Sequence, residues 1–405
     1  MITKIAWKNI LNKPLNSALC VSLLLFGVAI ISLLIIIQHQ IDQKFKQDLK
    51  NIDLVVGAKG SPLQLVLSAV YHVDAPTGNI NLSDAKKIIK SPSVKKAIPL
   101  AYGDSYKGYR ILGTTIDYIK KYEAKLAFGR HFKTPMEVTI GDAIASKTGL
   151  KEGDTFLGTH GEAGEGHVHE DQQYTVVGIL EKTNTVLDQL VLTNIISVWH
   201  VHHSHDEEPH HQEAETKSYL DFDDGQQEIT AILLEFKTKM AALNMPRLIN
   251  QQTNMQAVIP ALEMNRLIYN IGIGATTINY IAGGIILMAC FSIFFALYGR
   301  LKERKYELAL LRSVGYRPKH LFALVIYEGL FLAILGYVVG WILSRVGLYF
   351  INQQAESDFN LNFGFQYLNA EFILLLVIIL AGILSALIPA WQTVRMDISK
   401  ILSEK

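Results

Sequence analysis

Histidine is the residue type whose number and spacing most clearly suggest chemistry in this chain of 405 residues. The chain has 13 histidines, and most of them fall in one tract: His160, His167, His169, His200, His202, His203, His205, His210 and His211. Glutamate and aspartate are interleaved with these histidines. Neutral imidazoles together with carboxylates suit Zn²⁺, Ni²⁺ or Cu²⁺. The tract therefore predicts a metal-binding region.

The spacing within the tract argues against one rigid metal site. The H-x-H pairs do not chelate in the way that a helical i, i+4 pair does, and no His/Cys set has the spacing of a structural zinc fold. We therefore expect several weakly held, exchangeable ions. The alternative interpretation is a low-complexity, solvated loop with incidental affinity for metals.

No arrangement of residues predicts catalysis. The segment 141–155 (GDAIASKTGLKEGDT) is a near miss for the phosphate-binding loop G-x4-G-K-[ST], because Ser146 occupies the position of the second glycine. No catalytic triad can be argued. We expect that the chain is not an enzyme, needs no cofactor other than a possible metal ion, and does not hydrolyse ATP itself. A net charge of +1 gives no reason to expect a nucleic acid partner.

Four apolar stretches must position these residues relative to a membrane. They cover residues 15–37, 271–297, 321–343 and 372–390. Each is close to the length of about 20 residues that crosses a hydrocarbon core of about 30 Å. A polar stretch of more than 200 residues separates the first from the second. The sequence therefore predicts a membrane protein with four transmembrane helices in a 1+3 arrangement.

The distribution of lysine and arginine predicts the orientation of these helices. Basic residues precede the first stretch and are dense between the second and the third, at Arg300, Lys302, Arg304, Lys305, Arg312, Arg317 and Lys319. Residues 352–371 contain no lysine or arginine. By the positive-inside rule, both termini and residues 300–320 are cytoplasmic, and the large polar insert lies on the other side.

Two charged residues fall within the predicted spans. Glu328 lies about two turns into the third stretch, and a carboxylate at such a position usually faces protein or water. A helix-packing or coupling role fits it better than proton relay. Arg345, near the outer end of the same stretch, is most simply interpreted as an anchor whose side chain reaches the membrane surface.

The large insert has the pattern of an α+β domain held together by its own core. Residues 53–59, 174–180 and 231–237 are strand-like runs, and 82–91 predicts a helix capped by Ser83. Residues 38–50 continue the first helix, and 247–270 look like a helical return to the membrane with a break at Pro260. Both cysteines, Cys20 and Cys290, fall in apolar stretches, so the domain has no disulfide.

The segment between the second and third spans has a specific pattern, R-x-x-E-x-A-x-L-R-x-x-G, which begins at Arg304. Its site residues are Arg304, Glu307, Ala309, Arg312 and Gly315. The spacing predicts a short helix of mixed charge that ends at Gly315, because glycine accepts the left-handed conformation at a helix C-terminus. The alternative is a solvated loop of basic residues that face lipid headgroups.

This pattern resembles the FtsX/MacB-like family of ABC transporter permeases. The N-terminal segment 6–15 (AWKNILNKPL) and the C-terminal segment 389–402 (PAWQTVRMDISKIL) resemble the same family. The resemblance implies that the 304–315 helix is a coupling helix that docks on a separate cytoplasmic ABC ATPase. It also implies a homodimer in the inner membrane of a bacterium. The insert 160–215 departs from the family pattern.

The expected organisation combines the spans with this resemblance. A cytoplasmic amphipathic N-terminus (1–14) precedes the first helix (15–37), and the periplasmic α+β domain covers 38–270, with the histidine-rich insert at 160–215. The remaining segments are the second helix (271–299), the coupling loop (300–320), the third helix (321–350), a periplasmic loop (351–370), the fourth helix (371–393) and the cytoplasmic C-terminus (394–405).

The function that the resemblance implies is mechanotransmission. ATP hydrolysis by the partner ATPase would drive conformational work in the periplasm, such as the extrusion or release of a cargo, alone or with a periplasmic partner protein. Two alternatives remain open: a component of a zinc transporter, and a signalling or scaffold protein that regulates a periplasmic partner. A transporter of ions would need polar residues lining several spans, and Glu328 alone fits that requirement.

Overall fold

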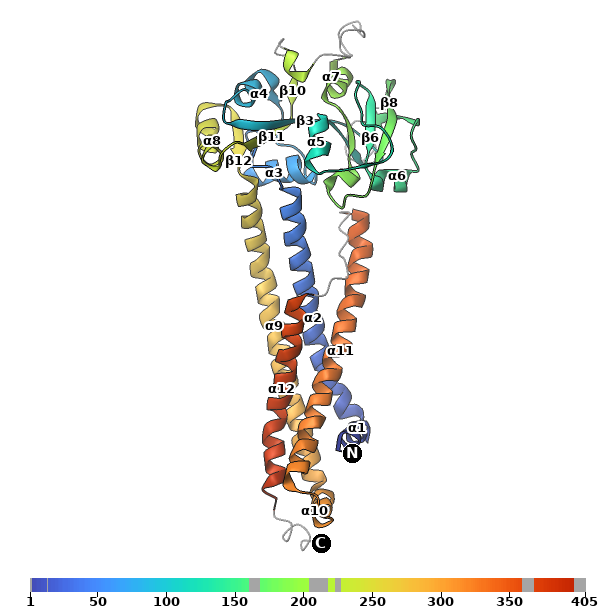
Figure 1. Ribbon diagram of the computed structural model, residues 1–405, viewed down its shortest axis with the longest axis vertical. Helices are drawn as coiled ribbons and strands as arrows, with labels where there is room; N and C mark the ends of the chain where they lie inside the picture. Colours follow the sequence, from blue (N-terminus) through green and yellow to red (C-terminus); the bar gives the residue numbers. More distant parts are fainter. Residues whose placement is uncertain are drawn as a thin grey trace. The chain divides into compact units, whose positions relative to one another are not determined.

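The computed structural model describes residues 2–12, 14–159, 168–203, 218–222, 227–358 and 368–396. The chain forms two compact units. The helical unit comprises Met1–Ile41 and Asn270–Lys405, and the sheet unit comprises Asp42–Tyr269. Figure 1 shows the helices of the first unit and the strands of the second.

Among the described residues, four helices are long and apolar enough to cross a membrane. They are α2 (Pro14–Asp48), α9 (Pro260–Glu303), α11 (Pro318–Asp358) and α12 (Asn369–Val394). The helical unit also contains the short helices α1 (Ile2–Asn12) and α10 (Lys305–Ser313). One long apolar helix comes before the strands of the sheet unit and three follow them, which confirms the predicted 1+3 arrangement.

The long helices extend beyond the apolar runs. Helix α2 continues through the polar residues 38–48, as the sequence predicts for the segment after the first span. Helix α11 continues to Asp358, so the start of the segment 351–370 is helical and not a loop. The apolar pattern identifies only the part of a helix that can lie in the hydrocarbon core. Polar turns can extend the same helix into water, because a helix that is already formed needs no new nucleation.

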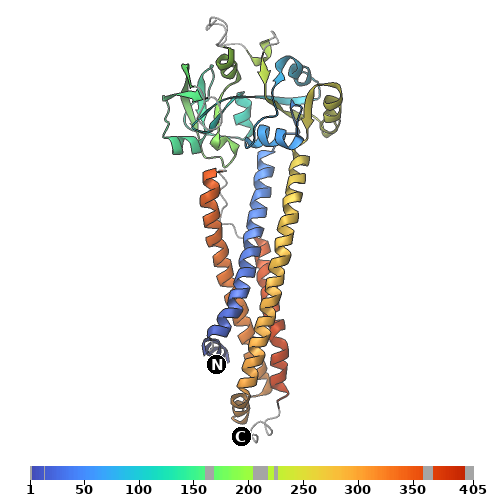
Figure 2. The ribbon, with the colours of Figure 1, turned by 180° about the vertical axis from the view of Figure 1, so that it is seen from behind.

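Small residues allow the helices of this unit to approach closely. A Cβ atom added to Gly382 of α12 would lie 2.5 Å from the Cβ of Ala333 of α11. A Cβ atom added to Gly340 of α11 would lie 2.6 Å from the carbonyl oxygen of Leu25 of α2. Helix α11 therefore packs against both α12 and α2. Helix α2 also lies beside α9 in both views (Figures 1 and 2).

The sheet unit is built on a mixed sheet of ten described strands. Their order is β12-β1-β11-β3-β4-β9-β6-β8-β5, and β7 pairs with β3 and β8. Most neighbours are antiparallel, whereas β4 with β9 and β6 with β8 are parallel. The strands are β1 (Leu54–Ala58), β3 (Val94–Tyr106), β4 (Tyr109–Thr114), β5 (Leu126–Gly129), β6 (Glu137–Ile140), β7 (Thr155–Thr159), β8 (Val168–Leu180), β9 (Val191–Asn194), β11 (Ala231–Phe236) and β12 (Met255–Val258).

Helices cover both faces of this sheet. Successive side chains of a strand point to opposite faces. Val55 accordingly belongs to a buried cluster that includes α3 (Pro62–Val66), and Leu54 belongs to a cluster on the other face that includes residues of α7 (Ile195–His203) and α8 (Lys239–Gln252). The other helical segments are η1 (Leu67–Tyr71), α4 (Leu82–Ile89), α5 (Ile116–Lys121), α6 (Asp142–Thr148), η2 (Val186–Gln189) and η3 (Tyr219–Asp221). Clusters of buried apolar side chains on both faces of the sheet therefore stabilise the domain without a disulfide.

Trp199 joins α7 to a small second sheet. The indole of Trp199 is 6% exposed, and its Nε1 donates to the carbonyl oxygen of Glu228 at 2.7 Å. Glu228 belongs to β10 (Glu228–Ile229), which pairs with β2 (Ile80–Asn81). The buried N–H of the indole thus has the partner that it needs.

Two local predictions in this unit are wrong. Ser83 does not cap α4, because strand β2 brings the chain in extended conformation to Asn81, which occupies the cap position without a side-chain bond. The segment 247–270 is not one helical return: α8 ends at Gln252, and Met255–Val258 form β12 against β1 before α9 begins at Pro260. The predicted strands at 53–59, 174–180 and 231–237 correspond to β1, part of β8 and β11.

Candidate coupling site

The segment 304–315 folds as a short helix between two helices of membrane length. Arg304 stands before α10 with a non-helical backbone, so α9 and α10 are separate helices. Gly315 has a φ of 106°, in the left-handed region that favours glycine. The N–H groups of Gly315 and Tyr316 donate to the carbonyl oxygens of Arg312 and Leu311, each at 3.1 Å. These bonds close the C-terminal end of α10.

One face of α10 holds it against three other helices. Leu308 is 8% exposed and Ala309 is 3% exposed. They belong to a buried cluster with Ala6 of α1, Leu301 of α9 and Leu321 of α11. Ala309 is therefore a packing residue, and a force on α10 acts directly on these three helices.

Arg304 and Glu307 form an ion pair at the start of α10, whereas Arg312 lies one turn after Leu308, on the packing face. The Nε of Arg304 donates to Oε2 of Glu307 at 2.6 Å, and the Glu307 side chain is 60% exposed. An exposed pair of this kind contributes at most about 1 kcal/mol to stability. Arg312 instead donates from Nη1 to the carbonyl oxygen of Met396 at 3.1 Å, which ties α10 to the segment after α12.

An apolar stripe on α10 was missed by sequence reasoning. Tyr306, Leu310 and Val314 are 43%, 49% and 75% exposed. Their spacing of four residues places them on one helix face. Together with the neighbouring Glu307, they give α10 an exposed surface that is both apolar and charged. The four-residue spacing of these apolar side chains is the signal in the sequence that predicts the stripe.

Glu328, the polar residue predicted inside the third span, is buried among other polar side chains. It is 6% exposed, and its Oε1 accepts from Nδ2 of Asn9 in α1 at 2.6 Å. Close by, Nη2 of Arg300 in α9 donates to the hydroxyl of Ser17 in α2 at 2.5 Å, and this hydroxyl donates to Ile10. These bonds join α1 to α11 and α2 to α9 near the coupling helix.

A second polar cluster lies toward the N-terminal end of α12, and it corrects the prediction for Arg345. Arg345 is not a surface anchor: its Nη2 donates to Oε2 of Glu371 at 2.7 Å. Oε1 of the same carboxylate accepts from the hydroxyl of Ser32 in α2 at 2.5 Å. Glu371 is 3% exposed, so the ion pair is shielded from solvent and joins α2, α11 and α12.

In the sheet unit, the end of α2 is held by a buried lysine. Nζ of Lys121 in α5 donates to the carbonyl oxygen of Asp48, the last residue of α2, at 2.9 Å. Burial lowers the pKa of Lys121 to about 7, although the Asp48 carboxylate opposes this shift. This bond fixes the last turn of α2, which belongs to the sheet unit, to α5, because it satisfies a carbonyl oxygen at the C-terminus of the helix.

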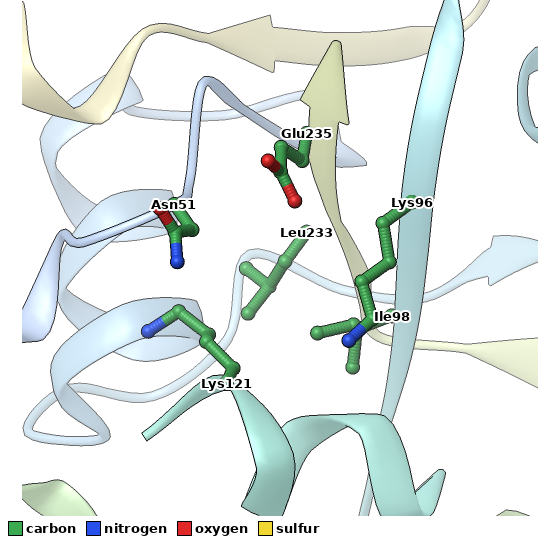
Figure 3. A pocket seen from close by; sticks show the side chains of 6 residues that line it. All are labelled: Asn51, Lys96, Ile98, Lys121, Leu233 and Glu235. Carbon is green, nitrogen blue, oxygen red and sulfur yellow. The ribbon is translucent and has the colours of Figure 1, made fainter. Parts of the chain in front are cut away.

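A small cavity adjoins this lysine (Figure 3). Its volume is about 30 Å³, and its polar lining residues are Asn51, Lys96, Lys121 and Glu235. The space suits a single water molecule bridging these groups. It is too small to hold a cargo.

The histidine tract falls mostly outside the described residues. His160, His167, His205, His210 and His211 lie outside them, and only the backbone is described for His169, His202 and His203. His200 is half-buried on α7. Within the described part of the chain, no three side chains form a metal-binding group. The metal site therefore stays a prediction.

The architecture defines a class of membrane protein: four membrane-crossing helices, with a large mixed α/β domain between the first and the second. Two family matches agree with this class. The MacB-like periplasmic core domain matches residues 17–232, and the FtsX-like permease C-terminal region matches residues 279–398. The first match covers more than half of the chain. The chain therefore belongs to the FtsX/MacB-like family of ABC transporter permeases.

Two solved structures are similar to parts of the chain. The periplasmic region of MacB from Actinobacillus actinomycetemcomitans is 11% identical, with a TM-score of 0.35; the match covers 56% of this chain and 98% of that one. The extracellular domain of the noncanonic ABC-type transporter YknZ from Gram-positive bacteria is 12% identical, with a TM-score of 0.31; the match covers 51% and 98%. No curated protein matches the chain significantly.

Membership of this family defines the type of complex to which the chain belongs. Its members are non-catalytic components of ABC transporters and work with a cytoplasmic ABC ATPase. The chain is accordingly a multi-pass permease subunit of the bacterial inner membrane.

Proposed function

We propose that this permease couples ATP hydrolysis by a separate cytoplasmic ATPase to conformational work in the periplasm. The observation that carries the proposal is the surface of α10. Its packing face is buried against α1, α9 and α11, while Tyr306, Glu307, Leu310 and Val314 are exposed. A short helix with one exposed and one buried face can bind a partner on its exposed face. Its buried face can then transmit the displacement of α10 to the membrane helices.

The orientation belongs to this proposal. Both termini and residues 300–320 are cytoplasmic, and the sheet unit is periplasmic. The excess of lysine and arginine in residues 300–320 supports it, because such residues are retained on the cytoplasmic side. Docking on a cytoplasmic ATPase requires the same orientation for α10.

A homodimer is also part of the proposal. Helix α9 is the least enclosed of the four long helices in the described part of the chain. In its apolar stretch of 18 residues, 22% is buried, against 33–44% for the corresponding stretches of the other three. Large apolar side chains of α9 are exposed at Ile273, Ile281, Leu287, Met288, Phe291 and Phe295. Pairing of α9 with a second copy would cover part of this surface.

Transmission would use the helices that continue from one unit into the other. Helices α2 and α9 each have residues in both units. Lys121 fixes the last turn of α2 to α5 in the sheet unit. Work of this kind fits the extrusion or release of a cargo.

Charge reversal at Glu307 and substitution of Gly315 by proline test the docking role. Glu307→Lys should weaken binding of the ATPase at least about tenfold, which corresponds to the loss of one contact of about 1.4 kcal/mol. Gly315→Pro should uncouple transport, because proline requires a φ near −65° and removes the N–H that donates to Arg312. Co-purification with the ATPase and permease-dependent ATP hydrolysis are the measurements.

The control is Glu181→Lys, the same charge reversal at an exposed position of the sheet unit. It should bind the ATPase as the unmodified chain does. All three proteins should insert and purify equally. Normal co-purification and normal hydrolysis with both coupling variants would refute the docking role.

We also propose that residues 160–211 bind Zn²⁺ or a similar ion in the periplasm. The imidazoles should release it as they protonate below roughly pH 6. Calorimetry on residues 40–268 can compare the natural tract with a variant in which the nine histidines are alanine. The variant should stay folded, because the described core does not include them. If both proteins titrate identically with zinc, the metal proposal falls.

A further inference from the structure

Arg300 is a buried cation whose hydrogen-bonding capacity is mostly unused. The residue is 6% exposed, yet its Nε and Nη1 have no hydrogen-bond partner in the described part of the chain. Only Nη2 is bonded, to the neutral hydroxyl of Ser17. A guanidinium has five N–H donors, and leaving them unpaired away from water is costly. The guanidinium of Arg300 can therefore accept further partners, and an anion suits it best.

A suitable anionic group on an adjacent helix is Glu328, which is equally buried. Helices α9 and α11 are close at this point, since a Cβ atom added to Gly329 would lie 3.5 Å from Cδ1 of Leu297, but the described contacts include no ion pair between Glu328 and Arg300. Instead, Glu328 is bonded to the neutral amide of Asn9. Each ion thus has a neutral partner, although an ion of opposite charge lies on an adjacent helix. Buried ions are normally paired with each other.

The position of Arg300 connects this arrangement to the coupling helix. Its carbonyl oxygen accepts the N–H of Arg304, the residue that separates α9 from α10, at 3.0 Å. Arg300 therefore lies one turn from the start of α10. A displacement of α10 moves the backbone that carries the Arg300 side chain.

We propose that Glu328 and Arg300 exchange their neutral partners for an ion pair with each other when the coupling helix is displaced. In the structure, Asn9–Glu328 joins α1 to α11, and Arg300–Ser17 joins α9 to α2. The ion pair would join α9 to α11 instead. The exchange would release α1 and the start of α2 together, because the hydroxyl of Ser17 also bonds Ile10 of α1. This inference rests on the proposed function and names a step within it.

Two substitutions separate an exchange from a merely structural role, because they should change activity in opposite directions. Glu328→Gln keeps an oxygen that accepts from Asn9 but cannot form the ion pair, so permease-dependent ATP hydrolysis should fall about tenfold, within the usual range of coupling energies. Asn9→Leu removes the first partner of Glu328 and should raise hydrolysis severalfold. The double variant should behave as Glu328→Gln alone. Asn12→Leu, the same change at an exposed position of α1, is the control and should have no effect.

A reversible cross-link provides a test in which one protein, compared before and after oxidation, is its own control. Sγ of Cys20 in α2 lies 3.3 Å from the hydroxyl of Ser292 in α9. Ser292→Cys, with Cys290→Ala, should therefore form a disulfide under oxidation and hold α2 against α9. ATP hydrolysis in the complex should be uncoupled after oxidation and recover after reduction.

The assays use the full chain with its ATPase in lipid nanodiscs. If the unmodified chain neither binds nor stimulates the ATPase, the proposed function itself fails. If it does both, but Glu328→Gln and Asn9→Leu change hydrolysis in the same direction, the exchange is overturned and the docking role stands. Additive effects in the double variant would also overturn the exchange. So would full coupling in the oxidised, cross-linked chain.

Discussion

Substituting Glu371 by alanine is expected to destabilise the helical unit by about 3–5 kcal/mol, the usual cost of removing one partner of a buried ion pair. Glu371 is 3% exposed and binds both Arg345 and Ser32. Its removal takes one carboxylate away from the largely buried guanidinium of Arg345 at the contact of α2, α11 and α12. Unfolding of the purified chain in mixed detergent, followed by circular dichroism, measures the change.

Two further substitutions show whether charge or packing is responsible. Glu371→Met combined with Arg345→Met removes both charges and should recover most of the lost stability, because an apolar pair of similar volume often replaces a buried ion pair without cost. Glu307→Ala removes an exposed carboxylate and should cost at most about 1 kcal/mol. A loss no larger for Glu371→Ala than for Glu307→Ala would show that the pair is unimportant.

The substitution Gly382→Leu is expected to prevent the normal packing of α11 against α12. Even a Cβ atom at this position would lie 2.5 Å from the Cβ of Ala333 and 3.2 Å from the carbonyl oxygen of Gly329. Overpacking of a well-packed interior commonly costs about 1–3 kcal/mol, and a whole leucine side chain between two helix backbones should cost at least that. The yield of monodisperse chain and its unfolding midpoint measure the effect.

The matched control for this experiment is Gly284→Leu in α9. A Cβ atom added to Gly284 meets no other atom within 4 Å. Both substitutions place leucine in an apolar helix, so within one copy of the chain they differ mainly in the space available, and both should be compared as monomers. Equal stability of the two variants would contradict the close contact between α11 and α12.

The 1+3 arrangement of the long apolar helices could be predicted from the sequence because its signal is local. A run of about 20 apolar residues is read without knowing what the helix contacts. The same holds for the end of α10, since Gly315 acts through its own backbone conformation. Strands such as β11 were also visible, because a short, nearly continuous apolar run is consistent with a buried strand.

The polar contacts of the helical unit could not be predicted, because their partners are far apart in the chain. Asn9 and Glu328 are 319 residues apart, and Ser32 and Glu371 are 339 apart. Arg345 was interpreted alone, so its ion pair with the next helix was missed. β12 was missed for a related reason: its pairing with β1 across the domain decides its conformation more than its own residues do.

The burial of Trp199 makes it possible to observe the sheet unit optically. The chain has four tryptophans, at positions 7, 199, 341 and 391, and only Trp199 falls within Asp42–Tyr269. A chain with phenylalanine at the other three positions would emit from this indole alone. Because Trp199 is 6% exposed and bonded to Glu228, its emission should shift to longer wavelength when the sheet unit opens. The melting of one unit could then be followed separately from that of the other, which a chain of two units requires.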